Sequence, residues 1–216
     1  MQQAKQLVPL STLEEMRIIQ FDSLQAYLPI YEKMRAFTLE RLPGTLDEIW
    51  LLEHHSVFTL GQAGKAEHIV QPATIPVIQS DRGGQITYHG PGQLMIYVLL
   101  DLNRLKINIR ELIDLLDRCI ITLLAQYNII GHTKPNAPGI YINDAKIASI
   151  GLRVRKGCSY HGICLNVEGD LSPFLSIHPC GYKDLAMTQM KNHNPNVTLA
   201  TVSHSITFLL KKLFTS

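Results

Sequence analysis

The sequence predicts an α+β fold, in which a mixed or antiparallel sheet is covered by helices. Two observations lead to this prediction: short strand-like apolar runs fill the middle of the chain, and segments with helical periodicity lie mainly at its margins. The elements do not alternate strictly between strand and helix, as they would in a parallel sheet. Because 216 residues fit one hydrophobic core, residues 1–216 are expected to form a single domain.

The first half of the chain is expected to contain one helix and several strands. Apolar residues recur at helical spacing over residues 23–42, and Pro43-Gly44 ends that segment. Apolar runs bounded by Gly, Pro or Asp then predict strands at Ile49–Leu52, Val57–Leu60, Ile75–Ile78 and Leu94–Leu102.

The second half is expected to hold two helices on either side of a strand meander. A helix is predicted at about 109–128, where Asn108 and Glu111 have the spacing of a capping box. A closing helix is predicted from about Thr201, with lysines near its C-terminal end, where the helix dipole favours cations. Between them, tight turns join three predicted strands, Gly139–Ile142, Lys146–Arg155 and Cys158–Val167.

Composition and charge argue against several classes of protein. The net charge is only +2 and the basic residues are scattered, so no nucleic-acid partner is expected. The longest apolar run, Leu94–Leu100, is far shorter than the roughly 20 residues of a membrane span, and the first residues lack the apolar stretch of a secretory signal. We therefore expect a cytoplasmic protein with four reduced cysteines and no need for a metal.

The densest chemical signal is the segment Asp81–Gln93, in which four glycines flank a strand-like piece that carries Thr87 and His89. Glycine permits positive φ angles and lets a ligand approach the backbone closely. From glycine content alone, two tight turns are as good an interpretation as a ligand site. The spacings of dinucleotide-binding and phosphate-binding loops do not occur here, so phosphate binding has no specific support.

The stretch from Arg82 to Tyr97, RGGQITYHGPGQLMIY, resembles the signature of the lipoyl/octanoyl transferases of lipoate biosynthesis. Further stretches agree over roughly residues 17–190, among them Lys146–Arg153 and Pro179-Cys180-Gly181, and little matches beyond. The resemblance implies the fold of the biotin and lipoate protein ligases. It also implies octanoyl transfer from octanoyl-acyl carrier protein to a lysine of a lipoyl domain, without ATP or another cofactor. The acceptors it implies are the lipoyl domains of 2-oxoacid dehydrogenase E2 subunits and the glycine cleavage H protein.

The resemblance assigns Cys180 as the nucleophile and Lys146 as its catalytic partner. A thiolate accepts an acyl group from a thioester at little energetic cost, and a nearby ammonium raises the thiolate fraction. The same lysine, once neutral, can take a proton from the incoming amine. The amides around Cys180-Gly181 and those of the Gly83-Gly84 turn remain alternative oxyanion donors.

Other matching residues belong to segments that line the acyl pocket of this family, and His161 is a further candidate, as a pocket donor. Those matching residues are Arg82, Gly83, Gly84, Gln85, Ile86, Thr87, Tyr88, His89, Ser149, Ile150, Gly151, Gly162, Ile163 and Cys164.

Several of these residues also have an ordinary structural interpretation. His89 and His161 fit a structural role as well as a pocket role. An exposed lysine is the default after a turn, but strict strand alternation would align Lys146 with the apolar row of Ala148, Ile150, Leu152 and Val154. Cys164 stands where the family usually has a small residue, so a second thiol is expected near the acyl chain.

Two other functions remain open at this point. An ATP-dependent lipoate or biotin ligase on the same fold would activate its acid as an adenylate and would need no cysteine. A non-catalytic regulator is the weakest alternative, because about sixteen residues before the first strand-like run are too few for a helix-turn-helix.

Overall fold

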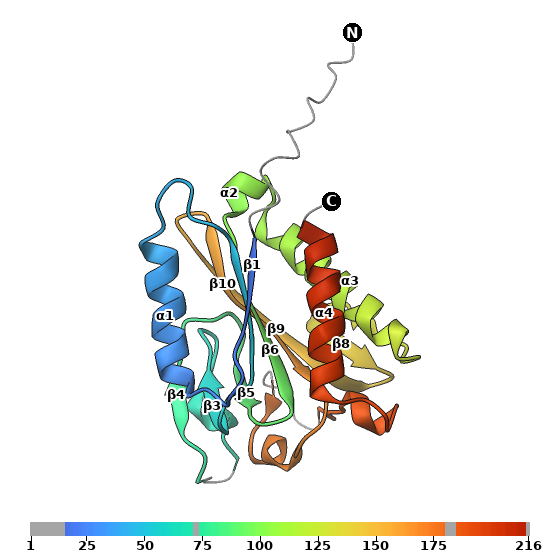
Figure 1. Ribbon diagram of the computed structural model, residues 1–216. Helices are drawn as coiled ribbons and strands as arrows, with labels where there is room; N and C mark the ends of the chain where they lie inside the picture. Colours follow the sequence, from blue (N-terminus) through green and yellow to red (C-terminus); the bar gives the residue numbers. More distant parts are fainter. Residues whose placement is uncertain (1–15, 71–73, 180–184, 215–216) are drawn as a thin grey trace.

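The computed structural model describes residues 16–70, 74–179 and 185–214. Its largest element is a sheet with the strand order β1-β2-β6-β10-β9-β8-β7 (Figure 1). Within the described ranges, β1 and β2 pair in parallel and the other neighbours are antiparallel. The strands of this large sheet are β1 (Arg17–Gln20), β2 (Glu48–Leu52), β6 (Gln93–Leu99), β7 (His132–Lys134), β8 (Ala137–Ile142), β9 (Ala145–Arg155) and β10 (Cys158–Asn166).

A small sheet of three strands, in the order β4-β3-β5, lies at the lower left of Figure 1. Its central strand β3 (Val57–Leu60) pairs in parallel with β4 (Val77–Gln79) and antiparallel with β5 (Ile86–His89). Strand β5 is the strand-like piece of the glycine-rich segment, and β6 follows it directly in the chain. The glycine-rich segment therefore joins the small sheet to the middle of the large one.

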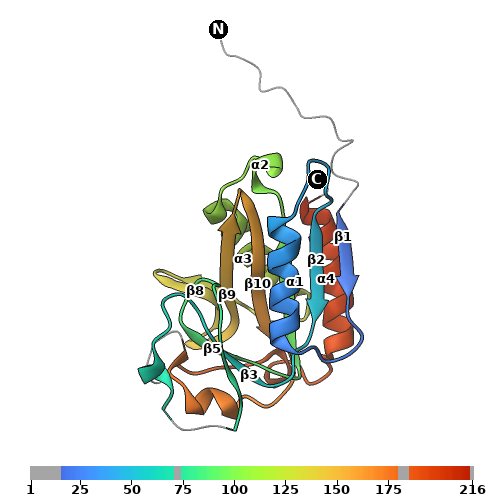
Figure 2. The same cartoon turned by 90° about the vertical axis from the view of Figure 1, so that its left-hand side faces the viewer.

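Helices cover both faces of the large sheet (Figures 1 and 2). Helix α1 (Tyr27–Leu39) lies on one face, and α3 (Ile109–Gln126) and α4 (Leu199–Phe214) lie together on the other. The short helix α2 (Leu102–Leu105) follows β6, and short 3-10 helices occur at Ala66–His68, Ser172–Ser176 and Met190–Asn192. The predicted α+β class, with a mixed sheet covered by helices, is confirmed.

Strand β6 shows how the sheet separates two apolar layers. Its seven residues are all buried, and successive side chains point to opposite faces. Leu94, Ile96 and Val98 belong to the core shared with α3 and α4, whereas Met95 and Tyr97 belong to the layer beneath α1. A central strand buried on both faces explains why its sequence is continuously apolar rather than alternating.

Most element predictions from the sequence are confirmed. The capping box of α3 forms, with Asn108 accepting from the Glu111 amide and the Glu111 carboxylate accepting from the Asn108 amide. The three-stranded meander forms as β8, β9 and β10, and the closing helix forms as α4. Among the described helices, none is long and apolar enough to cross a membrane. The cytoplasmic location stays a prediction.

Three predicted boundaries are wrong. The helix predicted over 23–42 spans Tyr27–Leu39, since Pro29 has no N–H to donate and is tolerated only in the first turn. The strand predicted to reach Leu102 ends at Leu99, because the Asp101 carboxylate accepts from the Arg104 amide and begins α2. The strand predicted at residues 75–78 lies at 77–79, where it pairs with β3.

Candidate active site

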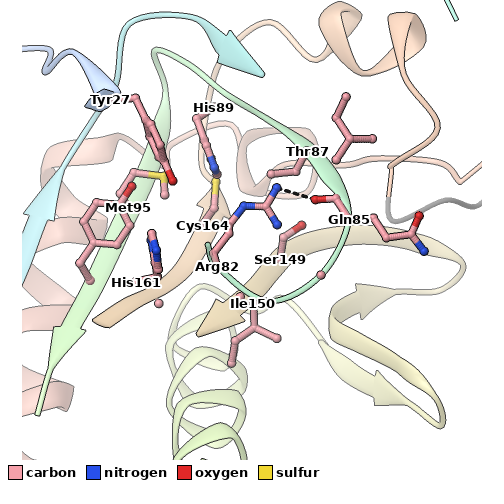
Figure 3. A pocket seen from close by; sticks show the side chains of 15 residues that line it. Tyr27, Arg82, Gln85, Thr87, His89, Met95, Ser149, Ile150, His161 and Cys164 are labelled. Carbon is pink, nitrogen blue, oxygen red and sulfur yellow. Dashed lines mark hydrogen bonds between the residues drawn. The ribbon is translucent and has the colours of Figure 1, made fainter. Parts of the chain in front are cut away.

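A pocket lies where the small sheet, the glycine-rich segment and the large sheet meet (Figure 3). Its walls come from β5, β6, β9 and β10 and from the first residue of α1. The space within it, counted together with the part open to solvent, is about 470 Å³.

The exposure of the walls distinguishes a mouth from a deep end. At the mouth, Gly84 is exposed and Gln85, Ser149, Ile150 and Gly151 are half-buried. Figure 3 shows the labelled Gln85 side chain on the opposite side of the pocket from Tyr27, Met95 and His161. The residues of the deep end are each at most 5% exposed, and they are Tyr27, His89, Met95, Tyr97, His161 and Cys164.

Arg82 holds the glycine-rich segment against β3. Its buried guanidinium donates from Nε to Thr59 Oγ1 (3.0 Å) and from its terminal nitrogens to the carbonyl oxygens of Thr59 (2.6 Å), Gly83 (2.9 Å) and Gln85 (2.6 Å). Only the planar fork of arginine presents so many donors at once, so lysine would not replace it. The close approach also requires Gly61, where a Cβ atom would lie 2.4 Å from the Gly84 carbonyl oxygen.

Strand β5 presents Thr87 and His89 to the pocket and Tyr88 to the other side, as strand alternation dictates. The Tyr88 ring packs edge-on against Phe174, and its hydroxyl lies 3.0 Å from Ser56 Oγ. His89 Nε2 lies 3.2 Å from the Thr59 hydroxyl. Burial lowers the pKa of His89 well below its usual value, so this ring is neutral at neutral pH.

The floor of the pocket depends on close contact between strands. A Cβ atom on Gly162 would lie 1.9 Å from the Ile96 carbonyl oxygen, so glycine is required for β10 to lie against β6. Two residues further on, the Cys164 thiol donates to Gln93 Oε1 (3.0 Å), and burial raises its pKa. Cys164 is therefore a neutral thiol at neutral pH and a poor nucleophile.

Most of the predicted pocket residues line this pocket, and three do not. Gly83 is set back, with its amide bonded to the Leu152 carbonyl; Tyr88 faces Ser56; and Ile163 points into the core shared with α3 and α4. Three lining residues were not predicted, namely Tyr27, Met95 and Tyr97. The alternation of β6 was the signal for Met95 and Tyr97, whereas no sequence signal links Tyr27 to this site.

His161 is fixed in place by Asp81 and by two tyrosine rings. Its φ angle of +61° in the middle of β10 is the left-handed conformation, which is rare for residues other than glycine. Its Nε2 lies 3.0 Å from Asp81 Oδ1, and its ring stacks against Tyr160 and Tyr31 at centroid distances of 4.9 and 5.5 Å. The Tyr160 hydroxyl also donates to Asp81.

The protonation of this pair follows from its environment. Burial opposes the ionisation of Asp81, but the hydrogen bonds from His161 and Tyr160 outweigh it and hold the Asp81 pKa below its usual range. Burial lowers the pKa of His161, so a neutral imidazole faces a carboxylate at neutral pH. Because a carboxylate only accepts, the proton lies on Nε2 and Nδ1 is an acceptor. His161 was predicted as a possible hydrogen-bond donor to the pocket, but its remaining nitrogen, Nδ1, is an acceptor.

Lys146 lies on β9 and is 1% exposed. Its Nζ is 5.3 Å from the centre of the Tyr141 ring on β8. Gly139 makes room for it, since a Cβ atom there would lie 2.9 Å from Lys146 Cε. The Lys146 amide donates to the Ala186 carbonyl (2.8 Å), and its carbonyl accepts from the Thr188 amide (2.9 Å). Cys180 and Gly181 lie outside the described residues.

The strict alternation expected along β9 does not hold next to Lys146. A register shift leaves Ile147 between the pairs Tyr141–Lys146 and Ile140–Ala148. Ile147 and Ala148 both belong to the core shared with α3 and α4. This β-bulge separates Lys146 from the apolar row, and such bulges re-aim side chains beside functional sites.

Solved structures define the class of fold. The structure of lipoate-protein ligase A bound with ATP matches with a TM-score of 0.77 at 15% identity, covering 92% of this chain and 85% of that one. A bi-partite lipoate protein ligase from Thermoplasma acidophilum, described with its E2 lipoyl domain, matches with a TM-score of 0.71 at 14% identity, covering 92% and 82%. The fold is that of the lipoate protein ligases, as the resemblance implied.

Sequence comparison assigns the family. A Klebsiella pneumoniae (strain 342) protein named octanoyltransferase is 58% identical over 180 residues, which cover 83% of this chain and 84% of that protein. Residues 33–210 match the lipoyl protein ligase A/B catalytic domain. The chain belongs to this family. Because the match reaches residue 210, the limit near residue 190 drawn from the motifs was too short, and most of α4 is part of the shared domain.

Proposed function

We propose that this protein transfers an octanoyl group from octanoyl-acyl carrier protein to the ε-amino group of a lysine in a lipoyl domain. The observation that carries the proposal is the 58% identity, over most of the chain, to a protein named octanoyltransferase. The pocket supports it, because its deep end is closed and lined largely by aromatic and apolar side chains, which suits an acyl chain.

In the first half-reaction, we assign the nucleophile to Cys180. Its thiolate attacks the thioester carbonyl, a new C–S bond forms, and the C–S bond to the carrier breaks. The carrier leaves as its own thiol by taking a proton from the Lys146 ammonium, which leaves the Lys146 amine neutral for the second half-reaction. The other three cysteines support this assignment. Burial raises the pKa of Cys119 to about 12 and also raises the pKa values of Cys158 and Cys164. Those three thiols stay protonated at neutral pH, and the thiolate is the reactive form.

In the second half-reaction, the amine of the acceptor lysine attacks the Cys180 thioester, and the cysteine leaves as the amide forms. An unperturbed lysine amine is protonated at neutral pH, so a base must take its proton. We assign that base to Lys146, whose main chain is bonded to Ala186 and Thr188 in the segment that follows the Cys180 motif. The octanoyl chain is assigned to the pocket lined by β5, β9 and β10.

The proposed acceptors are lipoyl domains of 2-oxoacid dehydrogenase E2 subunits and the glycine cleavage H protein. The related Thermoplasma ligase, described with its own E2 lipoyl domain, supports an acceptor of this kind.

Intact mass spectrometry tests the proposal. The protein is incubated with octanoyl-acyl carrier protein, and the expected product is a single octanoyl adduct that maps to the Cys180 peptide and disappears when a lipoyl domain is added. Cys180→Ala is expected to form no adduct, while Cys164→Ala, the matched control, is expected to form it. An adduct that persists in Cys180→Ala would remove Cys180 from the mechanism.

An ATP-dependent ligase is the second candidate, because the ATP-bound lipoate-protein ligase A shares this fold. Such an enzyme would release pyrophosphate from ATP when given free octanoate or lipoate. Octanoyl transfer with no nucleotide present would exclude this candidate.

A further inference from the structure

The deep end of the pocket holds two buried ring nitrogens that a plain acyl chain does not satisfy, one on His161 and one on His89. His161 Nδ1 is buried and has no hydrogen-bond partner among the described residues. The ring is held in this orientation, because Nε2 is bonded to Asp81 and the ring stacks against Tyr160 and Tyr31. Buried polar atoms are normally paired, so an unpaired one in a pocket wall points to the pocket's contents.

His89 Nδ1, also in the deep end, is likewise buried and without a partner among the described residues, whereas the other neighbouring polar groups are paired. His54 Nδ1 faces the Gln25 carbonyl (2.9 Å) and must donate to it, so His54 Nε2 accepts the proton of the Tyr97 hydroxyl (2.7 Å). The Tyr27 hydroxyl pairs with Ser80 Oγ (2.7 Å). The Cys164 thiol donates to Gln93, as described above. Since no described protein group, His89 included, bonds to His161 Nδ1, the donor for it has to come from whatever occupies the pocket.

The backbone at His161 supports a functional origin for this arrangement. A left-handed φ in the middle of a strand costs free energy, and such outliers cluster at ligand-binding positions. Figure 3 places the His161 ring with Tyr27 and Met95, on the side of the pocket away from Gln85. The unpaired acceptor thus lies at the end that an acyl chain entering from the mouth would reach last.

We infer that the deep end of the pocket binds an oxygen that donates a hydrogen bond to His161 Nδ1. That oxygen belongs either to a hydroxyl at the far end of an acyl chain or to one ordered water beyond a shorter chain. The inference rests on the proposed octanoyl transfer and specifies how the same pocket selects its chain. A terminal methyl group pushed against Nδ1 would expel the oxygen without replacing its hydrogen bond, so His161 limits chain length and tolerates a terminal hydroxyl.

Paired substrates test this inference in the wild-type protein. Acyl carrier protein is loaded with chains of increasing length, each as a terminal methyl and a terminal hydroxyl of equal size, such as nonanoyl and 8-hydroxyoctanoyl. In an apolar slot the hydroxyl lowers kcat/KM by about tenfold or more at every length. We expect that penalty to shrink to less than about threefold at the length that reaches His161. A penalty that stays constant along the series would overturn the inference.

The same series separates the two sources of the oxygen. If a chain hydroxyl is the better occupant, the hydroxyl chain that reaches His161 has a higher kcat/KM than the methyl chain that is one atom shorter. If water is the better occupant, that shorter methyl chain is the best substrate and the methyl chain of equal size is the poorest.

Two variants locate the effect. His161→Phe keeps a ring but removes the acceptor. At the critical length, which is the chain length that reaches residue 161, the terminal hydroxyl should then lower kcat/KM by the full factor seen at other lengths. Met95→Leu reshapes the same end without removing a polar atom, and it should change kcat/KM for both members of a pair alike. If His161→Phe does not fold, the wild-type series decides alone.

Calorimetric binding of the matching free acids keeps this inference separable from the proposed function. If no chain is transferred but the hydroxyl acid of the critical length binds as well as its methyl counterpart, the transfer proposal fails and the oxygen site stands. If octanoyl is transferred while the hydroxyl acids bind about tenfold more weakly at every length, the oxygen site fails and the transfer proposal stands.

Discussion

Protonation of His54 should make the stability of this protein depend on pH between about pH 6.5 and pH 4. His54 is fully buried, and its two ring nitrogens bond the Gln25 carbonyl and the Tyr97 hydroxyl. Burial lowers the pKa of His54 to about 4, compared with about 6.5 in an unfolded chain. The folded protein therefore resists a proton that the unfolded chain accepts.

The sign and size of the effect follow from linkage. Well above pH 6.5 neither state binds the proton at residue 54, and the stability contribution is intact. Between pH 6.5 and about 4 the unfolded chain binds more protons, so the free energy of unfolding falls as the pH falls. The full difference of about 2.5 pKa units corresponds to about 3 kcal/mol, of which about 2 kcal/mol is lost by pH 5.

Urea unfolding of the wild type and of His54→Gln, at several values between pH 7 and pH 5, measures this loss. Glutamine offers one donor and one acceptor but does not titrate, so the stability advantage of wild type over variant should shrink by about 2 kcal/mol across that range. The contribution of His161 is present in both proteins and cancels, and burial, the largest cause of the low His89 pKa, is also common to both. His204→Gln, at an exposed position of α4, is the control and should leave the slope unchanged. An advantage for His54 that stays constant with pH would refute the reasoning.

Three further predictions concern the mechanism and the fold. Lys146→Arg should lose most of the transfer activity while remaining folded by circular dichroism, since a guanidinium is not a base at neutral pH; near-normal turnover would limit Lys146 to an electrostatic role. Gly92→Ala should lower the free energy of unfolding, measured in urea, by more than about 3 kcal/mol, because its Cβ would lie 1.3 Å from the Glu168 carbonyl oxygen. The control Gly44→Ala, at a similar positive φ but with open space around it, should lower it by about 1 kcal/mol. Equal losses in the two variants would contradict this prediction. Brief iodoacetamide treatment at neutral pH should label the Cys180 peptide alone, since burial keeps the three described thiols protonated, and labelling of any of those by peptide mapping would contradict the assignment.

The sequence predicts local structure well wherever that structure depends only on residues close together in the chain. The capping box at Asn108 and the meander from Gly139 onward need only neighbouring residues, and both form. The end of β6 was missed because the apolar run continues through Leu100 and Leu102, and only the capping geometry of Asp101 shows that the strand has stopped. Apolar character fixes burial here, but not the choice between a strand and a short helix.

The site is harder to predict because distant segments complete it. The glycine-rich motif identifies one wall, while Tyr27 reaches the pocket from α1, more than fifty residues earlier in the chain. The bulge at Ile147 likewise depends on the register with β8, which strand alternation alone does not reveal. The nucleophile assignment still depends on the Pro179-Cys180-Gly181 motif and stays a prediction until the acyl adduct is mapped.

The buried polar groups around the pocket explain how an apolar site keeps a defined shape. Arg82 links the glycine-rich segment to β3, and Asp81 links the same glycine-rich segment to β10. His54 links β6 to the loop before α1. Each link is buried or partly buried, so removing one partner leaves the other unsatisfied at a cost of about 1–3 kcal/mol where it is fully buried. Apolar packing alone tolerates small slips between strands, whereas these bonds do not. A pocket that selects acyl chains by length needs such fixed walls, because one methylene changes the binding free energy by only about 1–3 kcal/mol.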